Sequence, residues 1–154
     1  MRHMKKKAAK EKAKKVEKKA KKEKIAHARG KRKRSIARAT IKGGKGNVRI
    51  NKLAVGALTN EYEREMIMEP LRIAGDIAKT IDVSVDVIGG GRMGQVQASR
   101  NAIAKALVEY TKDEELKKRL LESDHFLLFE DPRKVEPKKY MGRKARARFQ
   151  KSYR

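Results

Sequence analysis

A glycine-rich segment at residues 89–94 has the residue types and the spacing of a phosphate-binding loop. Gly89-Gly90-Gly91-Arg92-Met93-Gly94 matches the pattern G-x-G-x-x-G between a strand-like run and a helix-like run. Glycines let the backbone approach a ligand closely, and a helix N-terminus offers free N–H groups and the positive end of its dipole. The segment could hold a dinucleotide or an RNA phosphate, or it could be a structural loop that turns the helix back onto a sheet.

The sequence lacks the second feature of a dinucleotide-binding site. That fingerprint needs an acidic residue about 20 positions later, at the end of a second parallel strand. Here Glu109 lies late in a predicted helix, Asp113 opens another, and no further βαβ repeat follows. We therefore expect no cofactor at the loop, and we expect Arg92 to add a charge for an RNA phosphate.

The remaining polar residues form no catalytic or metal-binding pattern. His3, His27 and His125 are far apart in sequence, and the carboxylates at positions 61, 63 and 65 are expected on a solvated surface. The chain contains no cysteine, which excludes disulfides, Cys-based zinc sites and a Cys nucleophile. We expect no catalytic residue, no metal, no cofactor and no enzyme activity.

The net charge of +24 is concentrated at the two ends of the chain. Residues 1–34 contain 18 Lys and Arg against 3 acidic residues, residues 132–154 contain 10 against 1, and residues 35–131 contain 15 of each. Such cationic ends extend by self-repulsion, and nucleic acid neutralises them well. Tryptophan is absent, which favours phosphate contacts over base stacking.

Three segments follow from this distribution: a basic arm at residues 1–33, a globular domain at 34–131 and an extended basic tail at 132–154. The arm is rich in Lys, Ala and Glu, and it could become helical on RNA or remain a disordered tail. A coiled coil is the third alternative, but it would need larger apolar residues than the arm contains. It has no apolar signal region, and no run in the chain approaches the ~20 apolar residues of a membrane span. We expect no membrane partner.

The neutral middle has the patterning of an α/β domain. Residues 34–42 and 46–51 are predicted to pair as a β-hairpin across a glycine-rich turn, with folded structure beginning near Arg34. Residues 81–88 alternate apolar and polar side chains and predict a strand, and residues 93–110 predict a helix that buries Ala98, Ala102 and Leu107.

Shorter patterns complete the predicted domain. Helical spacing is present at residues 53–58 and again at 61–68, where Pro70 is expected to end the helix or to begin a new one. Asp113 is expected to cap a helix that runs to about Leu121. Residues 126–129 predict a short buried strand, before Asp131-Pro132 begins the tail.

The tail has a composition suited to extended contact with RNA. Small residues such as Ala145 and Ala147 separate basic side chains, and Tyr140, Phe149 and Tyr153 provide aromatic faces. Arginines can grip a phosphate with two hydrogen bonds, whereas lysines act as point charges. Nonspecific polycation behaviour is the alternative for this segment alone.

Four groups of residues, in order, resemble the family of small-subunit ribosomal protein nine. The central signature is Gly89-Gly90-Gly91, Gly94-Gln95, Ala98, Ala102, Ala104, Lys105 and Leu107. The others are Gly30-Lys31-Arg32-Lys33 with Ala37-Arg38-Ala39 and Gly44-Lys45-Gly46; Asp131-Pro132-Arg133, Glu136 and Lys138-Lys139; and Ala145-Arg146 with Gln150-Lys151-Ser152-Tyr153-Arg154. The resemblance covers residues 30–154, and the Ser-Tyr-Arg ending is similar to archaeal or eukaryotic members.

The resemblance implies a single two-layer α/β domain in which a hairpin-led mixed sheet packs against helices. It implies a structural protein of the cytoplasmic ribosome that binds small-subunit rRNA in the head, beside neighbouring ribosomal proteins. The expected rRNA-binding residues are Lys31, Arg32, Lys33, Arg34, Arg38, Lys42, Lys45, Arg92, Arg133, Lys138, Lys139, Arg143, Lys144, Arg146 and Arg148.

The resemblance also implies that the tail reaches the anticodon arm of the peptidyl-site tRNA. The matching residues are Lys151, Ser152, Tyr153 and Arg154. The principal alternative to a ribosomal role is a non-ribosomal nucleic-acid compaction protein that uses its two cationic ends on duplex DNA.

Overall fold

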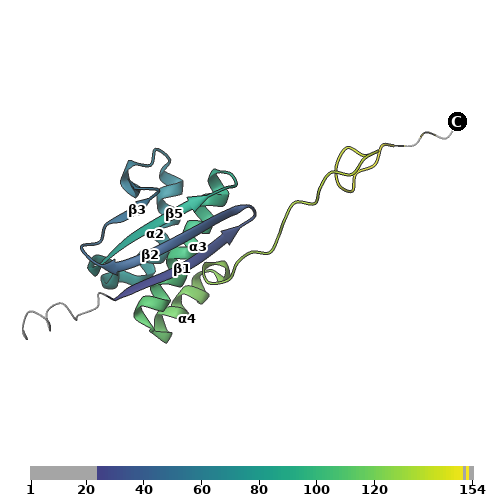
Figure 1. The fold of residues 1–154 in the computed structure, drawn as a ribbon. Helices are drawn as coiled ribbons and strands as arrows, with labels where there is room; N and C mark the ends of the chain where they lie inside the picture. Colours follow the sequence, from purple (N-terminus) through teal and green to yellow (C-terminus); the bar gives the residue numbers. More distant parts are fainter. Residues whose placement is uncertain (1–23, 151, 153–154) are drawn as a thin grey trace, which may run out of the picture.

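A computed structural model describes residues 24–150 and 152, which form a mixed five-stranded sheet with three α-helices packed behind it (Figure 1). The strands are β1 (Ile25–Arg32), β2 (Ser35–Gly43), β3 (Val48–Ile50), β4 (Leu53–Ala54) and β5 (Ile81–Ile88). The helices are α2 (Glu61–Ala74), α3 (Arg92–Thr111) and α4 (Glu114–Ser123), with 3-10 turns η1 (Val55–Ala57), η2 (Gly75–Thr80) and η3 (His125–Leu127). The two-layer α/β prediction is confirmed.

The helices bury one face of the sheet and leave the other open. The inner side chains of β5 alternate with exposed ones, as the sequence predicted, and Val83 and Val85 are buried beside Ile41 of β2. Helix α3 packs across β1, β2 and β5, and it buries Ala98, Ala102 and Leu107 as predicted. Asp113 caps α4 by accepting a hydrogen bond from the backbone N–H of Glu115 (2.9 Å).

The predicted hairpin between residues 34–42 and 46–51 is wrong. The strand order is β1-β2-β5-β3-β4, so β5 lies between β2 and β3 and pairs parallel with β3. The carboxylate of Asp82 in β5 accepts hydrogen bonds from the backbone N–H groups of Lys45 and Asn47, both at 2.9 Å. The glycine-rich turn is therefore fastened to β5, and it does not join two neighbouring strands.

Folded structure begins earlier than the predicted start near Arg34. β1 occupies Ile25–Arg32 and forms the actual hairpin with β2, in antiparallel register. Its inward positions carry small residues because α3 lies very close: a Cβ on Gly30 would lie 2.2 Å from the backbone oxygen of Ala98. Because these positions carry small side chains, the composition of β1 resembles that of a solvated arm, and the sequence did not predict a buried strand there.

Three shorter predictions also differ from the structure. Helix α2 continues through Pro70, whose ring is buried in the core and offsets the missing backbone hydrogen bond. Residues 53–57 form β4 and η1 in place of a helix. The segment at 126–129 contains η3 and not a strand; Leu127 is buried, whereas Phe126 and Phe129 are 42% and 52% exposed.

Beyond residue 131 the chain leaves the domain as an extended segment without helix or strand, and it runs away from the sheet and helices in Figure 1. None of the helices in the described part of the chain is both long enough and apolar enough to cross a membrane. The expectations for the arm at residues 1–23 lie outside the described residues.

Candidate nucleic-acid interface

Most glycines of the loop at 89–94 are required by contact with the turn between β1 and β2. Gly89 and Gly90 have positive φ angles of 75° and 70°. A Cβ on Gly90 would lie 2.0 Å from the hydroxyl of Ser35, and one on Gly94 would lie 2.8 Å from the same atom. These glycines therefore have the structural role of letting the loop pack on the hairpin.

Gly91 is different, because its φ of −111° is extended and a Cβ there would have no heavy atom within 4 Å. It is the N-cap residue of α3, and no side chain caps that end of the helix. The first turn of α3 also contains no acidic residue. The free N–H groups and the dipole of the helix thus face an open position that an anion could occupy.

A hollow of about 650 Å³ lies at this helix end. Its basic side chains come from three parts of the chain: Lys33 and Arg34 from the hairpin turn, Arg92 from α3 and Lys134 from the tail. The hydroxyl of Ser35 also lines it, is buried and has no hydrogen-bond partner among the described residues. The hollow therefore combines four cations with unsatisfied donors, which suits a phosphate group.

Sequence reasoning identified three of these four cations and missed Lys134. The available signal was its place in the same basic run as Arg133, at the entry to the tail. Its proximity to Lys33 depends on the path of the chain beyond α4, which has no periodic pattern to predict it.

Arg92 has an internal partner that the sequence did not reveal. Its guanidinium lies 3.0 Å from the Glu63 carboxylate, whose side chain is only 9% exposed although a solvated position was expected. Arg92 itself is 73% exposed, so its guanidinium can face a ligand while it neutralises Glu63. A charge reversal at position 92 would place two carboxylates together and would disturb the fold.

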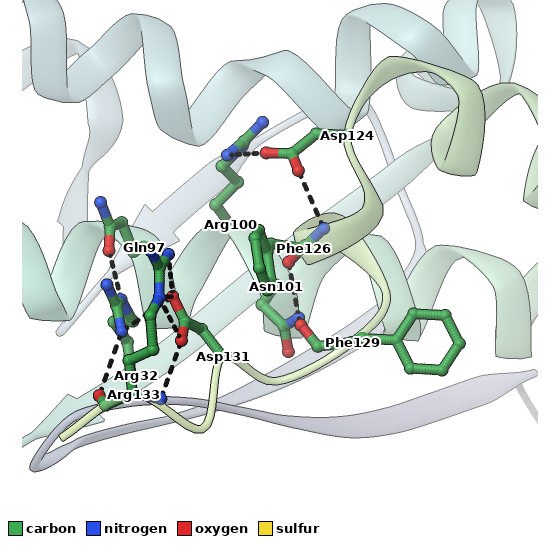
Figure 2. Close-up of polar contacts among 9 residues, drawn as sticks. All are labelled: Arg32, Gln97, Arg100, Asn101, Asp124, Phe126, Phe129, Asp131 and Arg133. Carbon is green, nitrogen blue, oxygen red and sulfur yellow. Dashed lines mark hydrogen bonds and ion pairs between the residues drawn. The ribbon is translucent and has the colours of Figure 1, made fainter.

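Arg32 and Arg133 converge on a third residue, Asp131 (Figure 2). The Nη1 of Arg32 and the Nη2 of Arg133 lie 3.0 and 2.5 Å from Asp131 Oδ2. Hydrogen bonds from the Arg133 side chain lower the pKa of Asp131 to about 2, and the charge of Arg32 acts in the same direction. Both arginines are thus directed toward a carboxylate of the protein itself.

Other predicted rRNA-binding residues are spread over the open sheet face and its turn. Arg38 and Lys42 are exposed on β2, and Lys31 is half-buried on β1. Lys45 is exposed in the glycine-rich turn. The backbone N–H groups of Asn47 and Lys45 donate to the Asp82 carboxylate and lower the pKa of Asp82. The structure therefore places Arg38, Lys42 and Lys45 outside the hollow, whereas Lys31 lines a neighbouring depression together with Lys33 and Lys134.

The tail folds into a small loop near its end. The backbone N–H of Arg143 donates to the backbone oxygen of Ala147 (3.1 Å), and Gly142 and Arg148 form an isolated antiparallel β-bridge. The guanidinium of Arg143 lies over the Phe149 ring, 5.9 Å from its centroid. Arg146 pairs with Glu136 at 2.6 Å, which raises the pKa of Arg146 and lowers that of Glu136.

The remaining predicted positions in the tail are exposed or lie outside the described residues. Lys138, Lys139, Lys144 and Arg148 are exposed and have no ion pair within the described chain. Ser152 is exposed. The expected tRNA contacts Lys151, Tyr153 and Arg154 lie outside the described residues.

No group of three or more potential metal ligands occurs among residues 24–150 and 152. The ring of His27 is hydrogen-bonded to the Thr40 hydroxyl (3.1 Å), and that of His125 stacks on Phe129 with a centroid distance of 4.4 Å. Neither histidine belongs to a catalytic arrangement. What the described residues present is a hollow lined by four cations and further exposed cations on β2 and the tail.

Comparison with known proteins agrees with that geometry. Residues 30–154 match the family described as ribosomal protein S9/S16. The chain is 50% identical over 131 residues to the small ribosomal subunit protein uS9 of Desulfurococcus amylolyticus, covering 85% of this chain and 94% of that protein. It is 44% identical over 131 residues to the uS9 protein of Methanothrix thermoacetophila (85% and 99% covered) and 48% identical over 125 residues to that of Picrophilus torridus (81% and 94% covered).

These relatives are archaeal, one of the two groups that the Ser-Tyr-Arg ending resembles, and the matched range is the one over which the motifs were found. The chain belongs to the ribosomal protein S9/S16 family, whose members are structural, non-enzymatic proteins of the ribosome.

Proposed function

We propose that this chain, as a constituent of the small ribosomal subunit, binds the subunit's rRNA in the head and extends its tail to the anticodon arm of the peptidyl-site tRNA. The observation that carries the rRNA proposal is the hollow at the N-terminus of α3, where Lys33, Arg34, Arg92 and Lys134 surround an uncapped helix end. Phosphate contacts of this kind position a protein on RNA without reading its sequence.

The hollow suits an rRNA backbone better than a small nucleotide. It is open and lined by four basic side chains, and it lacks the acidic residue that would bind a ribose hydroxyl in a dinucleotide site. Arg38 and Lys42 add exposed cations on β2 outside the hollow. A polymer of phosphates can contact both regions at the same time.

The tail provides the second region of contact. Its exposed cations, Lys138, Lys139, Arg143, Lys144 and Arg148, lie on a segment that leaves the domain and has few contacts with it (Figure 1). Such a segment can pass between rRNA helices where a folded domain would not fit. The four residues Lys151, Ser152, Tyr153 and Arg154 match the family's ending and are our proposed contacts with tRNA.

The rival function is compaction of duplex DNA, and a pair of double variants tests it. Arg34→Gln with Lys134→Gln removes two cations from the hollow, whereas Lys117→Gln with Lys118→Gln removes two exposed cations from α4. We expect the first variant to weaken binding to small-subunit rRNA, with the log–log salt slope reduced by about 0.7–0.9 for each phosphate that is no longer neutralised. The α4 variant should bind nearly as the parent does.

The measurement is a filter-binding or anisotropy titration at several salt concentrations, on small-subunit rRNA and on duplex DNA of equal length. A preference for rRNA and a specific decrease in affinity at the hollow support the proposal. Equal affinity for both nucleic acids, or equal decreases in the two variants, would support nonspecific compaction and contradict it.

A further inference from the structure

The start of the tail is held by a carboxylate that is almost completely buried. The side chain of Asp131 is 5% exposed, in a domain where most other carboxylates are solvated. It accepts hydrogen bonds from the backbone N–H of Arg133 (2.9 Å) and from the Arg133 Nε, at 3.0 Å for Oδ1 and 2.9 Å for Oδ2. A charge this well enclosed needs its partners, because an unpaired buried carboxylate is strongly destabilising.

Arg32 connects that carboxylate to the core. Its Nε donates to the Gln97 side-chain oxygen of α3 (2.8 Å), and its Nη1 pairs with Asp131 at 3.0 Å. The backbones of Arg32 and Asp131 also form an isolated parallel bridge. The end of β1, the middle of α3 and the first residues of the tail are thus joined through one guanidinium (Figure 2).

Helix α3 fixes the segment that leads to Asp131. The Asn101 Nδ2 lies 3.0, 3.1 and 2.9 Å from the backbone oxygens of Phe126, Leu127 and Phe129. Arg100 pairs with Asp124 at 2.9 Å. The chain from α4 to the tail is therefore attached to the domain at successive points. Asp131 and Arg133, whose backbone oxygen lies 3.4 Å from Arg32 Nη1, are the last of them in the described tail.

We propose that Asp131 is a positioning residue that sets the direction in which the tail leaves the domain, and that Arg32 and Arg133 serve as its internal partners and not as phosphate contacts. The first part concerns the free protein and does not depend on the proposed function. The consequence for RNA rests on the proposed function, because a tail that is already directed loses less conformational freedom on binding.

The first test measures the direction of the tail in the full chain without RNA. Because the chain has no cysteine, Ser84→Cys on the exposed face of β5 and Val135→Cys in the tail can each carry one spin label. Pulsed electron spin resonance then gives the distribution of distances between them. Asp131→Asn keeps the size and the acceptor for the Arg133 N–H but removes the charge.

We expect a narrow distribution in the labelled parent and in the control Glu136→Gln, which breaks the Arg146 pair within the tail but leaves the tail's attachment intact. Asp131→Asn should widen the distribution at least about twofold, and Arg32→Gln should do the same while Arg32→Lys partly restores it. A distribution in Asp131→Asn as narrow as in the parent would overturn the proposal. Circular dichroism of each variant checks that the domain remains folded.

The second test uses the sign of the change in rRNA affinity. If Asp131 only masked two arginines, Asp131→Asn would release them, tighten binding to small-subunit rRNA and steepen its salt dependence. A positioning role predicts the opposite: binding about two- to tenfold weaker with an unchanged salt slope, because the tail is less ordered before binding while every phosphate interaction remains. Tighter binding would contradict the positioning role even if the hollow binds rRNA as proposed.

Discussion

At the scale of single residues, neighbouring glycines in the loop at 89–94 have different reasons to be glycine. Gly90→Ala should destabilise the fold by at least about 1–2 kcal/mol, because φ is 70° and the new Cβ would lie 2.0 Å from the Ser35 hydroxyl. Gly91→Ala should cost less, because its backbone is extended and nothing lies within 4 Å, so that only the poorer N-capping by alanine remains. Urea denaturation of both variants measures the difference, and equal stabilities would contradict it.

The same two residues separate a structural role from an RNA-binding role. A side chain at Gly91 points into open space in the free protein, so any decrease of rRNA affinity in Gly91→Val reports close approach of RNA to the backbone. Unchanged affinity in that variant would leave the loop with only its packing role against the hairpin.

Asp131 should make the stability of the fold depend on acid pH. Its pKa falls from the ordinary 3.8 to about 2, chiefly through hydrogen bonds from Arg133, so the ionised form favours the folded state. This contribution is fully present above the unfolded pKa and is lost as the pH falls through the folded one. The stability difference between the parent and Asp131→Asn should therefore be constant above about pH 5 and shrink between about pH 4 and pH 2.

Thermal unfolding of both proteins across this range measures that difference. Comparison with the variant is needed because the carboxyls of Asp82 and Glu136 also have lowered pKa values and act in the same direction. A difference that stays constant down to pH 2 would mean that Asp131 does not titrate as its contacts indicate.

At the scale of secondary structure elements, the contact between β1 and α3 fixes where the domain begins. Gly30→Ala should destabilise the fold by about 1–3 kcal/mol, because its Cβ would lie 2.2 Å from the Ala98 oxygen and 2.6 Å from the Ala102 nitrogen, both backbone atoms that must shift. The control Gly43→Ala, whose Cβ has only the Tyr110 hydroxyl at 3.8 Å, should be neutral. Chemical denaturation of the two variants compares them, and similar midpoints would argue against tight packing of β1 on α3.

This contact also explains what the sequence could and could not predict. β5, α3 and α4 were predicted because each has a complete apolar period or a cap of its own. β1 was missed because its buried positions are the small residues Ala26 and Gly30, which give no apolar pattern. They are small because the small residues of α3 pack directly against them. The false hairpin arose because pairing between adjacent segments is the common case, whereas β5 enters the sheet from about 30 residues further along.

The ion pairs could not be predicted from the sequence either, because they depend on residues that are brought together only by the fold. Three of the basic residues expected to bind rRNA, Arg32, Arg92 and Arg133, have carboxylate partners within the described chain. The Arg32–Asp131 pair joins residues about 100 positions apart, and no local spacing indicates it. Arg146 in the tail pairs with Glu136 in the same way. The exposed cations without a carboxylate partner in the described residues are better candidates for phosphate contacts: Arg38 and Lys42 of β2, and Lys138, Lys139, Lys144 and Arg148 of the tail.

At the scale of the whole molecule, a neutral domain carries a cationic tail that extends away from it (Figure 1). The end of β1, the glycine loop and the tail converge at one end of the sheet, and the tail extends from there away from the domain (Figure 1). Under the proposed function, the domain binds rRNA at the hollow and the last residues contact tRNA. Removing the last residues should therefore affect a different partner from disrupting the hollow.

Removal of residues 152–154 should leave the fold and incorporation into the subunit nearly intact while weakening retention of the peptidyl-site tRNA. The core and most of the charge remain, and one guanidinium–phosphate contact contributes roughly 1.5–3 kcal/mol, toward the low end when it is exposed to solvent. The effect should be several-fold, and Arg154→Ala alone should reproduce most of it, whereas Arg148→Ala, an exposed tail position, should not. The measurement is the rate of tRNA dissociation from subunits that carry each variant. Equal rates in truncated and parent subunits would remove the tRNA role and leave the binding of rRNA as the function of the tail.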